Sequence, residues 1–248
     1  EKMYIILLSI ILPIAFGIFL LVKKEYADRK YLLCTVTAAF IMICVSVISV
    51  LTTAGGTSFT LFYLTKSLPV IFTVDELSVL FCTVTLIVFL CAGFFSFEYM
   101  KHETGKKRCY GFYLIVFGVL NALCFAGSLV TFYIFFEMLT LTSLPLVLHN
   151  GSREAIMAGL KYLFYSLCGA YMALFGIYFV FQNSDTLVFA YGGVLNENAL
   201  SHTGALLIAA FVMLLGFGVK AGMFPMHAWL PAALGVLESP GACGADIA

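Results

Sequence analysis

Seven long apolar stretches constrain this chain more than any other feature of its sequence. They run over residues 3–22, 32–51, 77–97, 110–127, 129–148, 155–181 and 204–237. A helix needs about 20 predominantly apolar residues to cross a bilayer, and helices satisfy all their backbone hydrogen bonds internally. We therefore predict an all-α, polytopic transmembrane helix bundle of about seven helices, forming a single transmembrane domain over residues 1–248.

The composition excludes a soluble globular domain. Hydrophobic residues make up 62% of the chain and charged residues only 10%, and the mean hydropathy is +1.07. The apolar share of a soluble domain is about half. The formal net charge is zero, and no basic stripe is interleaved with aromatic residues, so no nucleic-acid partner is predicted.

Basic residues predict the orientation of the helices. Nine of the thirteen follow the first, third or fifth stretch, namely Lys23, Lys24, Arg29, Lys30, Lys101, Lys106, Lys107, Arg108 and Arg153. Basic residues concentrate in cytoplasmic loops. We therefore expect odd-numbered helices to end on the cytoplasmic side and the loop 182–203, which has no Lys or Arg, to lie outside.

The segment 54–76 is not predicted to span the membrane. It mixes apolar residues with Thr60, Thr65, Lys66 and Pro69 and has no clean helical period. We interpret it as a hairpin or interfacial segment on the outer surface. Asp75 at its end is expected to cap the third helix.

Glu137 and Lys220 are ionisable residues inside apolar stretches. A charged side chain at membrane depth costs about 2.5–3.5 kcal/mol on insertion scales, so it is expected to face a partner, a cavity or a proton path. Tyr133, Glu137 and Thr140 share one face of the fifth helix, which should face protein. The alternative is a permanently protonated glutamate that only bridges helices.

The seventh stretch is too long for one straight span, because 204–237 would extend about 50 Å as a helix. We predict a break among Gly216, Gly218, Gly222 and Pro225. Broken helices in transporters place ion sites near the midplane, where Lys220 would lie. The alternative is a lysine near the end of a shorter helix. The Gly218–Gly222 step indicates close helix packing.

Lys161 and His227 are further candidates for a proton relay. Lys161 shares a face of the sixth helix with Tyr165 and Cys168, although a lysine this close to a helix end can also reach the headgroups. His227 suits a structural or a proton-carrying role equally. Trp229 is interpreted as part of an interfacial aromatic belt.

The sequence shows no sign of a metal, a cofactor or a catalytic site of its own. Its eight cysteines include no C-x-x-C pair and no histidine at ligand spacing, so neither a zinc site nor a disulfide framework is indicated. The motifs of zinc proteases, serine hydrolases and phosphate-binding loops are missing.

Several motifs resemble one known family. They are VDELS at 74–78, FEYM at 97–100, FFEMLTLTSLPL at 135–146, GLKYLF at 159–164 and VKAGMFPMHAWLPAA at 219–233. Their order and content are similar to the proton-conducting antiporter-like subunits of respiratory complex I, membrane-bound hydrogenases and Mrp-type Na⁺/H⁺ antiporters. The resemblance implies that Glu137 pairs with Lys220 in a proton relay.

The resemblance also implies a fold of two inverted five-helix repeats, each with a broken helix. Of the seven helices predicted here, the fourth to the seventh would belong to the first repeat, which is therefore only partly present. We expect a truncated N-terminal part that does not transport alone. Gly222 and Leu234 depart from the family, which has Pro and commonly His there.

The function expected from the resemblance is proton translocation through the buried Glu137–Lys220 pair, with charged Glu137 favouring protonated Lys220. The chain would be a multi-pass subunit of the cytoplasmic membrane, in an NADH:quinone oxidoreductase-like or hydrogenase-like complex. The expected partners are other membrane subunits, including homologous antiporter-like ones. The expected ions are protons, with sodium as the ion that an antiporter would exchange for them. The alternatives are an Mrp-type Na⁺/H⁺ antiporter subunit and a structural membrane subunit that does not transport.

Overall fold

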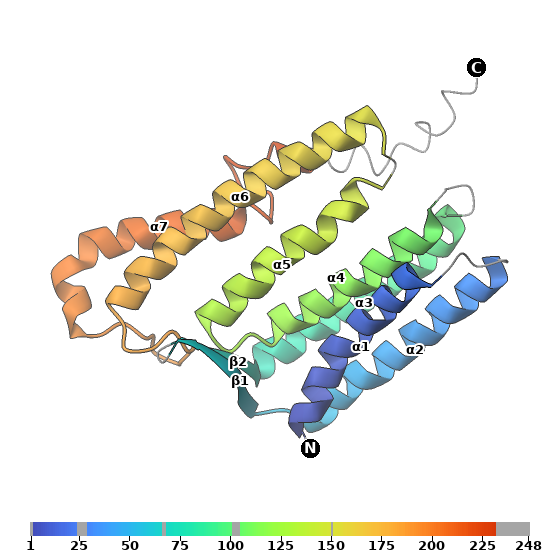
Figure 1. Cartoon of the computed structure of the whole chain (residues 1–248). Helices are drawn as coiled ribbons and strands as arrows, with labels where there is room; N and C mark the ends of the chain where they lie inside the picture. Colours follow the sequence, from blue (N-terminus) through green and yellow to red (C-terminus); the bar gives the residue numbers. More distant parts are fainter. Residues whose placement is uncertain (1, 24–28, 66–67, 101–104, 150, 232–248) are drawn as a thin grey trace. The chain divides into compact units, whose positions relative to one another are not determined.

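The computed structural model describes residues 2–23, 29–65, 68–100, 105–149 and 151–231 (Figure 1). Three expectations concern residues outside this set: the orientation signals at Lys24 and Lys101, the loop residue Lys66, and the end of the seventh stretch at 232–237.

The described residues contain all seven predicted helices. They are α1 (Lys2–Val22), α2 (Arg29–Thr53), α3 (Glu76–Tyr99), α4 (Lys106–Cys124), α5 (Leu129–Val147), α6 (Arg153–Gln182) and α7 (Thr203–Gly218). The prediction of a helical membrane protein with a broken seventh helix is confirmed, since α7 ends at Gly218 in the middle of its apolar stretch. A short 3₁₀ helix, η1 (Glu197–His202), precedes α7.

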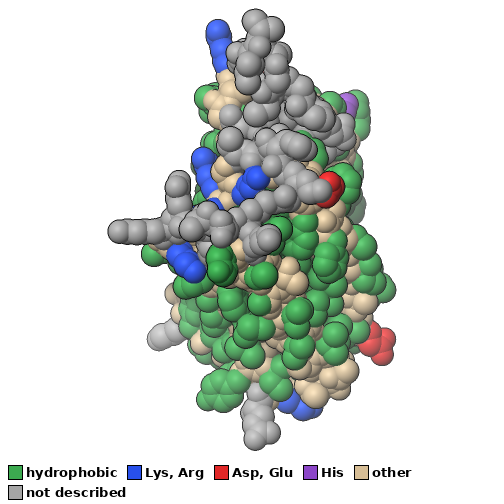
Figure 2. Space-filling view, turned by 90° about the vertical axis from the view of Figure 1, so that its right-hand side faces the viewer, with side chains coloured by type: hydrophobic (Ala, Val, Ile, Leu, Met, Phe, Trp, Pro, Cys, Tyr) green, Lys and Arg blue, Asp and Glu red, His purple; other side chains and the backbone are tan. Residues whose placement is uncertain are grey.

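Six segments of the described chain are long and apolar enough to cross a membrane. Five are α1, α2, α3, α5 and α6, and the sixth is Ala199–Gly218, which includes α7. The helix α4 falls outside this set because Lys106, Lys107 and Arg108 occupy its first turn. Large apolar side chains are exposed along these helices, and many of them are visible, in green, on the face shown in Figure 2. Such a surface suits lipid contact.

The segment between α2 and α3 is the predicted hairpin. Its strands β1 (Thr57–Thr65) and β2 (Leu68–Val74) pair in a two-stranded sheet. Alternate residues of β2, Val70, Phe72 and Val74, are buried, as expected for the period of a strand. Asp75 caps α3 as predicted, since its carboxylate accepts a hydrogen bond from Ser78 N at 2.7 Å.

The chain divides into two compact units. Unit 1 comprises residues 1–61 and 71–127, with α1 to α4, and unit 2 comprises residues 62–70 and 128–248, with α5 to α7. In unit 1, α1 packs against α2 and α4, and α3 packs against α2 and α4. In unit 2, α6 packs against both α5 and α7.

Unit 1 is held together by close helix contacts and buried rings. A Cβ atom on Gly17 would lie 2.5 Å from Gly111 O, so the small residues allow α1 to approach α4 closely. The Tyr113 ring stacks on Phe89 with centroids 4.3 Å apart, and its hydroxyl donates to Phe89 O at 2.6 Å. Buried Asn121 donates to Ser9 O at 3.2 Å, which satisfies its amide in an apolar interior.

In unit 2, small residues set the contact between α6 and α7. A Cβ atom on Gly169 would lie 2.7 Å from Gly216 O, and one on Gly216 would lie 2.5 Å from Ala173 N. Gly222 has φ +67° in the turn after α7, a conformation that favours glycine. The predicted close packing through Gly218 and Gly222 is therefore wrong: Gly216 makes the helix contact, and Gly222 forms a turn.

Candidate functional site

Lys220 lies just beyond the end of α7, in the break of the seventh apolar stretch. The chain leaves the helix at Gly218, turns through Gly222, and is helical again at Trp229. Two backbone bonds fix this turn: Gly222 N donates to Val219 O at 3.1 Å, and Met223 N donates to Gly218 O at 3.0 Å. The break therefore holds the lysine backbone in an ordered turn and removes it from a regular helix.

The Lys220 ammonium group is held by hydroxyls and aromatic rings of α5 and α6. Its Nζ donates to Thr140 Oγ1 at 2.5 Å and to Tyr162 Oη at 3.3 Å. It also lies 5.1 Å from the ring centroid of Phe136 and 5.6 Å from that of Tyr162. These distances allow cation–π attraction. Neutral groups thus provide the direct contacts to this half-buried cation.

Glu137 lies on α5, one turn before Thr140, and is half-buried. Within the described chain its Oε1 atom is buried without a hydrogen-bond partner. Its charge interacts with that of Lys220, but the two groups do not form an ion pair within 4.0 Å in the described residues. Their direct pairing therefore stays a prediction, although the structure brings both residues into one region of unit 2.

The rest of the predicted stripe on α5 also faces protein. Thr140 is 1% exposed, and the Tyr133 hydroxyl donates to Ala170 O of α6 at 3.3 Å. The expectation that this face packs against protein is thus confirmed.

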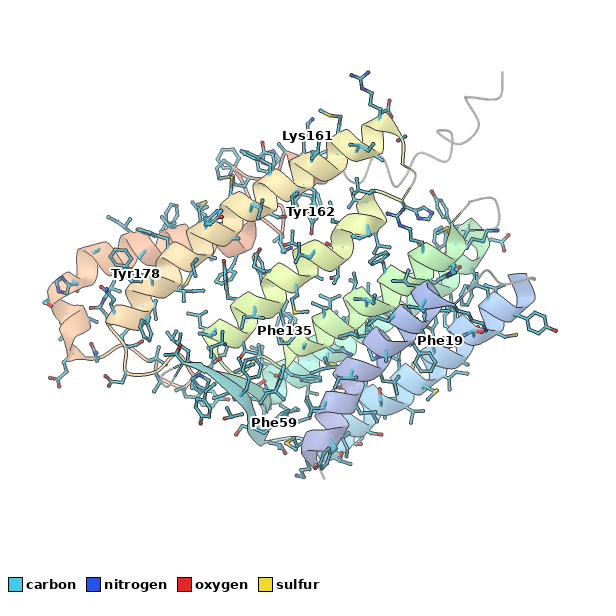
Figure 3. The ribbon with its side chains drawn as sticks, in the orientation of Figure 1. Phe19, Phe59, Phe135, Lys161, Tyr162 and Tyr178 are labelled. Carbon is cyan, nitrogen blue, oxygen red and sulfur yellow. The ribbon has the colours of Figure 1, made fainter. Side chains whose placement is uncertain are left out.

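Lys161 and His227 are not brought to Lys220. Lys161 is exposed on α6, and Figure 3 shows it leaving the helix in a different direction from its neighbour Tyr162. His227 is also exposed, with its ring 5.9 Å from that of Phe224. A relay role for either residue stays a prediction, and neither contributes a contact to the ammonium group.

Trp229 is inside unit 2, so its assignment to an interfacial belt is wrong. Its side chain is 8% exposed, and its Nε1 donates to Val219 O at 2.9 Å. Its ring packs on Tyr162 with centroids 5.0 Å apart. Tryptophan needs a partner for its N–H when buried, and here the partner is the carbonyl just before Lys220. Trp229 therefore fastens the turn after the break to α6.

The sequence analysis missed Tyr162 and Ser143. Tyr162 is 5% exposed, and its hydroxyl lies 2.6 Å from Ser143 Oγ of α5. A usable signal was present in the sequence: the buried face of α6 carries small residues at helical spacing, including Ala155, Ala158, Gly159, Ser166 and Gly169. Tyr162 stands in that stripe, whereas Lys161 lies about 100° away from it.

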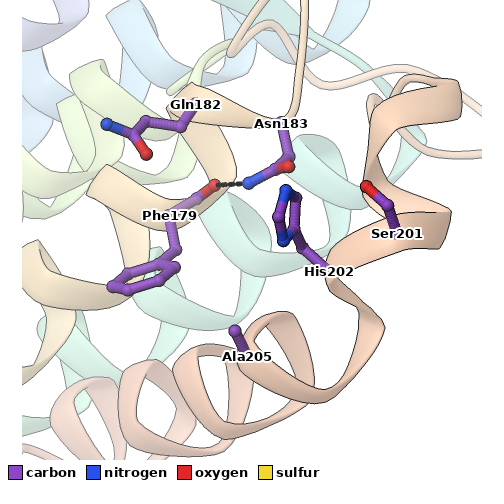
Figure 4. A pocket seen from close by; sticks show the side chains of 6 residues that line it. All are labelled: Phe179, Gln182, Asn183, Ser201, His202 and Ala205. Atoms are coloured by element: carbon purple, nitrogen blue, oxygen red, sulfur yellow. Dashed lines mark hydrogen bonds between the residues drawn. The ribbon is translucent and has the colours of Figure 1, made fainter.

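A separate pocket of about 450 Å³ lies at the other end of α6 (Figure 4). It is lined by Phe179, Gln182, Asn183, Ser201, His202 and Ala205. The two amides already donate within the protein: Asn183 Nδ2 to Phe179 O at 2.9 Å and Gln182 Nε2 to Tyr178 Oη at 2.5 Å. The pocket is about five helical turns from Tyr162 and is separate from the Lys220 cluster.

Comparison with known proteins identifies the family. The model described as "NADH:quinone oxidoreductase/Mrp antiporter, TM" matches residues 126–245, which include the whole Lys220 cluster. The model "NADH-Ubiquinone oxidoreductase (complex I), chain 5 N-terminus" matches residues 64–110. The chain belongs to this family of antiporter-like membrane subunits. It is thus a multi-pass membrane protein.

Relatives in the antiporter-like family come from different complexes. The chain is 28% identical over 156 residues to a Na(+)/H(+) antiporter subunit of Alkalihalophilus pseudofirmus, covering 61% of this chain and 31% of that protein. It is 31% identical over 162 residues to Hydrogenase-4 component B of Escherichia coli, covering 64% and 23%. The chain thus spans about a third or less of the length of these relatives.

The fold of the antiporter-like family is also evident in three dimensions. The chain superposes on respiratory complex I from Thermus thermophilus with a TM-score of 0.67 at 23% identity. The match covers 92% of this chain and 46% of the matched chain in that complex. The predicted membrane-helix fold is therefore confirmed by structural likeness.

Proposed function

We propose that this chain is a proton-translocating, antiporter-like subunit in which Lys220 takes up and releases the transported proton. The observation that carries the proposal is the placement of the Lys220 ammonium group at the helix break, on the hydroxyls of Thr140 and Tyr162. A lysine at membrane depth is costly, so it is retained where it serves a function. The break supplies a reason for a polar site there, because free backbone groups accompany it.

The neutral surroundings of Lys220 suit a group that changes its charge. In a tight buried ion pair, removing one charge leaves the other uncompensated and costs about 3–5 kcal/mol. Hydroxyl oxygens accept from an ammonium group and can also donate to a neutral amine. Lys220 can therefore lose its proton without leaving a buried counter-charge in direct contact.

Glu137 is the proposed modulator of Lys220. Its charge favours the protonated lysine, and movement or neutralisation of the carboxylate removes that attraction. The unpartnered Oε1 atom supports this role, because a buried polar atom without a partner needs a functional or structural reason. Proton uptake at Lys220 would thus follow the charge state of Glu137.

The partners and the driving reaction follow from the relatives. We propose assembly with other membrane subunits, including homologous antiporter-like ones, in the cytoplasmic membrane. Redox chemistry in partner subunits would drive the movement of protons. Direct Na⁺/H⁺ exchange is the second candidate, because a Na(+)/H(+) antiporter subunit is among the relatives. Sodium dependence of proton flux in the absence of an electron donor would separate the two.

The decisive experiment replaces Glu137 by Gln and, separately, Lys220 by Met. Both variants keep the approximate side-chain shape and remove a titratable charge. Proton flux in inverted membrane vesicles containing the chain and its partner subunits should fall at least tenfold, while the amount of assembled complex stays near normal. Glu197→Gln removes an exposed carboxylate of η1 and serves as the matched control. Unchanged flux in both variants would instead favour a structural subunit.

A further inference from the structure

The Tyr162 hydroxyl is the centre of a small hydroxyl network. It lies 2.6 Å from Ser143 Oγ and 3.3 Å from Lys220 Nζ. The side chain is 5% exposed, so these contacts are made inside unit 2. The three residues come from α5, α6 and the segment after α7, and the network therefore joins all three elements.

The direction of each hydrogen bond follows from the number of hydrogens available. Ser143 has a single hydroxyl hydrogen, and it donates this hydrogen to Leu139 O at 2.6 Å. Ser143 must then accept from Tyr162 across their 2.6 Å contact. Protonated Lys220 has three donors and no acceptor, so the Tyr162 oxygen accepts from it. The chain of donors thus runs from Lys220 through Tyr162 to Ser143.

The reverse order becomes possible when Lys220 is neutral. A neutral amine has a lone pair, and that lone pair makes it a good acceptor. The Tyr162 O–H bond can rotate to donate to it, at the expense of the hydrogen bond to Ser143. Tyr162 keeps its own proton in both states, and no covalent bond of the tyrosine forms or breaks.

The ring of Tyr162 is fixed while its hydroxyl hydrogen can rotate. The ring packs on Trp229 with centroids 5.0 Å apart and an interplanar angle of 58°. Trp229 is itself bonded to Val219 O. The oxygen therefore stays within reach of both Ser143 and Lys220, so that the rotating hydrogen is the mobile part.

We infer that Tyr162 is a positioning residue whose hydroxyl reverses its hydrogen bond with the charge of Lys220, and so sets how readily Lys220 releases its proton. This inference rests on the proposed function and adds a specific residue to it. Two other titratable groups of the described chain bear on the charge of Lys220 or lie on its segment. Glu137 of α5 interacts with the lysine charge, and His227, on the same segment as Lys220, is exposed.

The test is Tyr162→Phe, which keeps the ring against Trp229 and removes only the hydroxyl. Protonated Lys220 loses one acceptor, so the alkaline limb of the pH–rate profile for proton flux should move to lower pH by roughly one unit. Ser143→Ala should move the alkaline limb in the same direction by a smaller amount. The Tyr162 hydroxyl hydrogen no longer bonds to Ser143 in this variant, so it is free to donate to the neutral Lys220 amine. The double variant should match Tyr162→Phe, since both act through one hydroxyl.

Tyr113→Phe is the matched control. It also removes a phenol hydroxyl that joins two helices, at 2.6 Å from Phe89 O, but in unit 1. Its pH–rate profile should keep the wild-type position. A Tyr162→Phe profile that keeps the wild-type position, whether or not the maximal rate falls, would overturn the inference.

A second readout separates this inference from the proposed function. The ¹⁵N signal of Lys220 Nζ, identified by its loss in Lys220→Arg, can be followed against pH in the detergent-purified protein with its partners. Its titration should move to lower pH in Tyr162→Phe even if Lys220→Met turns out to leave proton flux intact. An unmoved titration contradicts the role of Tyr162, whereas intact flux in Lys220→Met contradicts the transport role of Lys220.

Discussion

Lys220 Nζ lies 2.5 Å from Thr140 Oγ1, and this contact joins the broken end of α7 to the middle of α5. The two residues are 80 positions apart in the chain. Thr140 is one turn from Glu137 on the same helix, so the hydroxyl holds the lysine in the same region as the carboxyl, with no ion pair between them in the described residues.

Thr140→Val should lower proton flux because it removes this hydroxyl and nearly preserves the shape of the side chain. An ammonium donor left without its partner costs about 1–3 kcal/mol, which corresponds to an effect of roughly five- to 150-fold. The measurement is proton flux per assembled complex in vesicles. Thr142→Val is the control, because its hydroxyl bonds to Met138 O of its own helix at 2.9 Å. Equal flux in the two variants would show that the Lys220–Thr140 contact is dispensable.

Gly169→Val should destabilise unit 2 by about 1–3 kcal/mol, the usual cost of overpacking. The new side chain would meet Gly216 O at 2.7 Å and Val219 Cγ2 at 2.8 Å, and so push α7 away from α6. Thermal unfolding in detergent measures the effect. Gly204→Ala is the control, since nothing lies within 4 Å of the Cβ position there. A Gly169→Val protein as stable as the control would refute the close contact between the two helices.

Asn121→Leu should destabilise unit 1 by about 1–3 kcal/mol, because it leaves buried partners without their hydrogen bonds. Asn121 is fully buried, donates to Ser9 O at 3.2 Å and accepts from Cys82 Sγ at 3.6 Å. We expect reduced yield and a lower unfolding temperature, with the pH–rate profile of the remaining protein unchanged. A moved profile would mean that unit 1 acts on the Lys220 cluster.

Labelling of single cysteines should place Asp185→Cys outside and Arg153→Cys on the cytoplasmic side, in a chain whose native thiols have been replaced. Both residues are exposed and stand at opposite ends of α6. The distribution of basic residues predicts this orientation. A membrane-impermeant thiol reagent added to intact cells should react at 185 only. Reaction at residue 153 only would show that the helices have the opposite orientation to the predicted one.

Local sequence signals determined the helices, the hairpin position and the cap at Asp75. Apolar length alone predicts a helix in a bilayer, since no other open segment can satisfy its backbone there. The excess length of 204–237 together with its glycines predicted the break, which the structure places after Gly218. The depth of Glu137 and Lys220 was likewise evident from the apolar residues around them.

Only the tertiary structure decided which side chains meet Lys220. Neighbouring residues on a helix point about 100° apart. Lys161 is therefore exposed and Tyr162 buried, although they are adjacent in the sequence. Trp229 could be assigned inward only once the turn after Gly218 had brought its N–H to Val219 O. The sequence by itself determined where charges enter the apolar stretches, because that depends on composition along the chain. The partners of those charges depend on helix rotation and on the path of the break, which packing between distant segments sets.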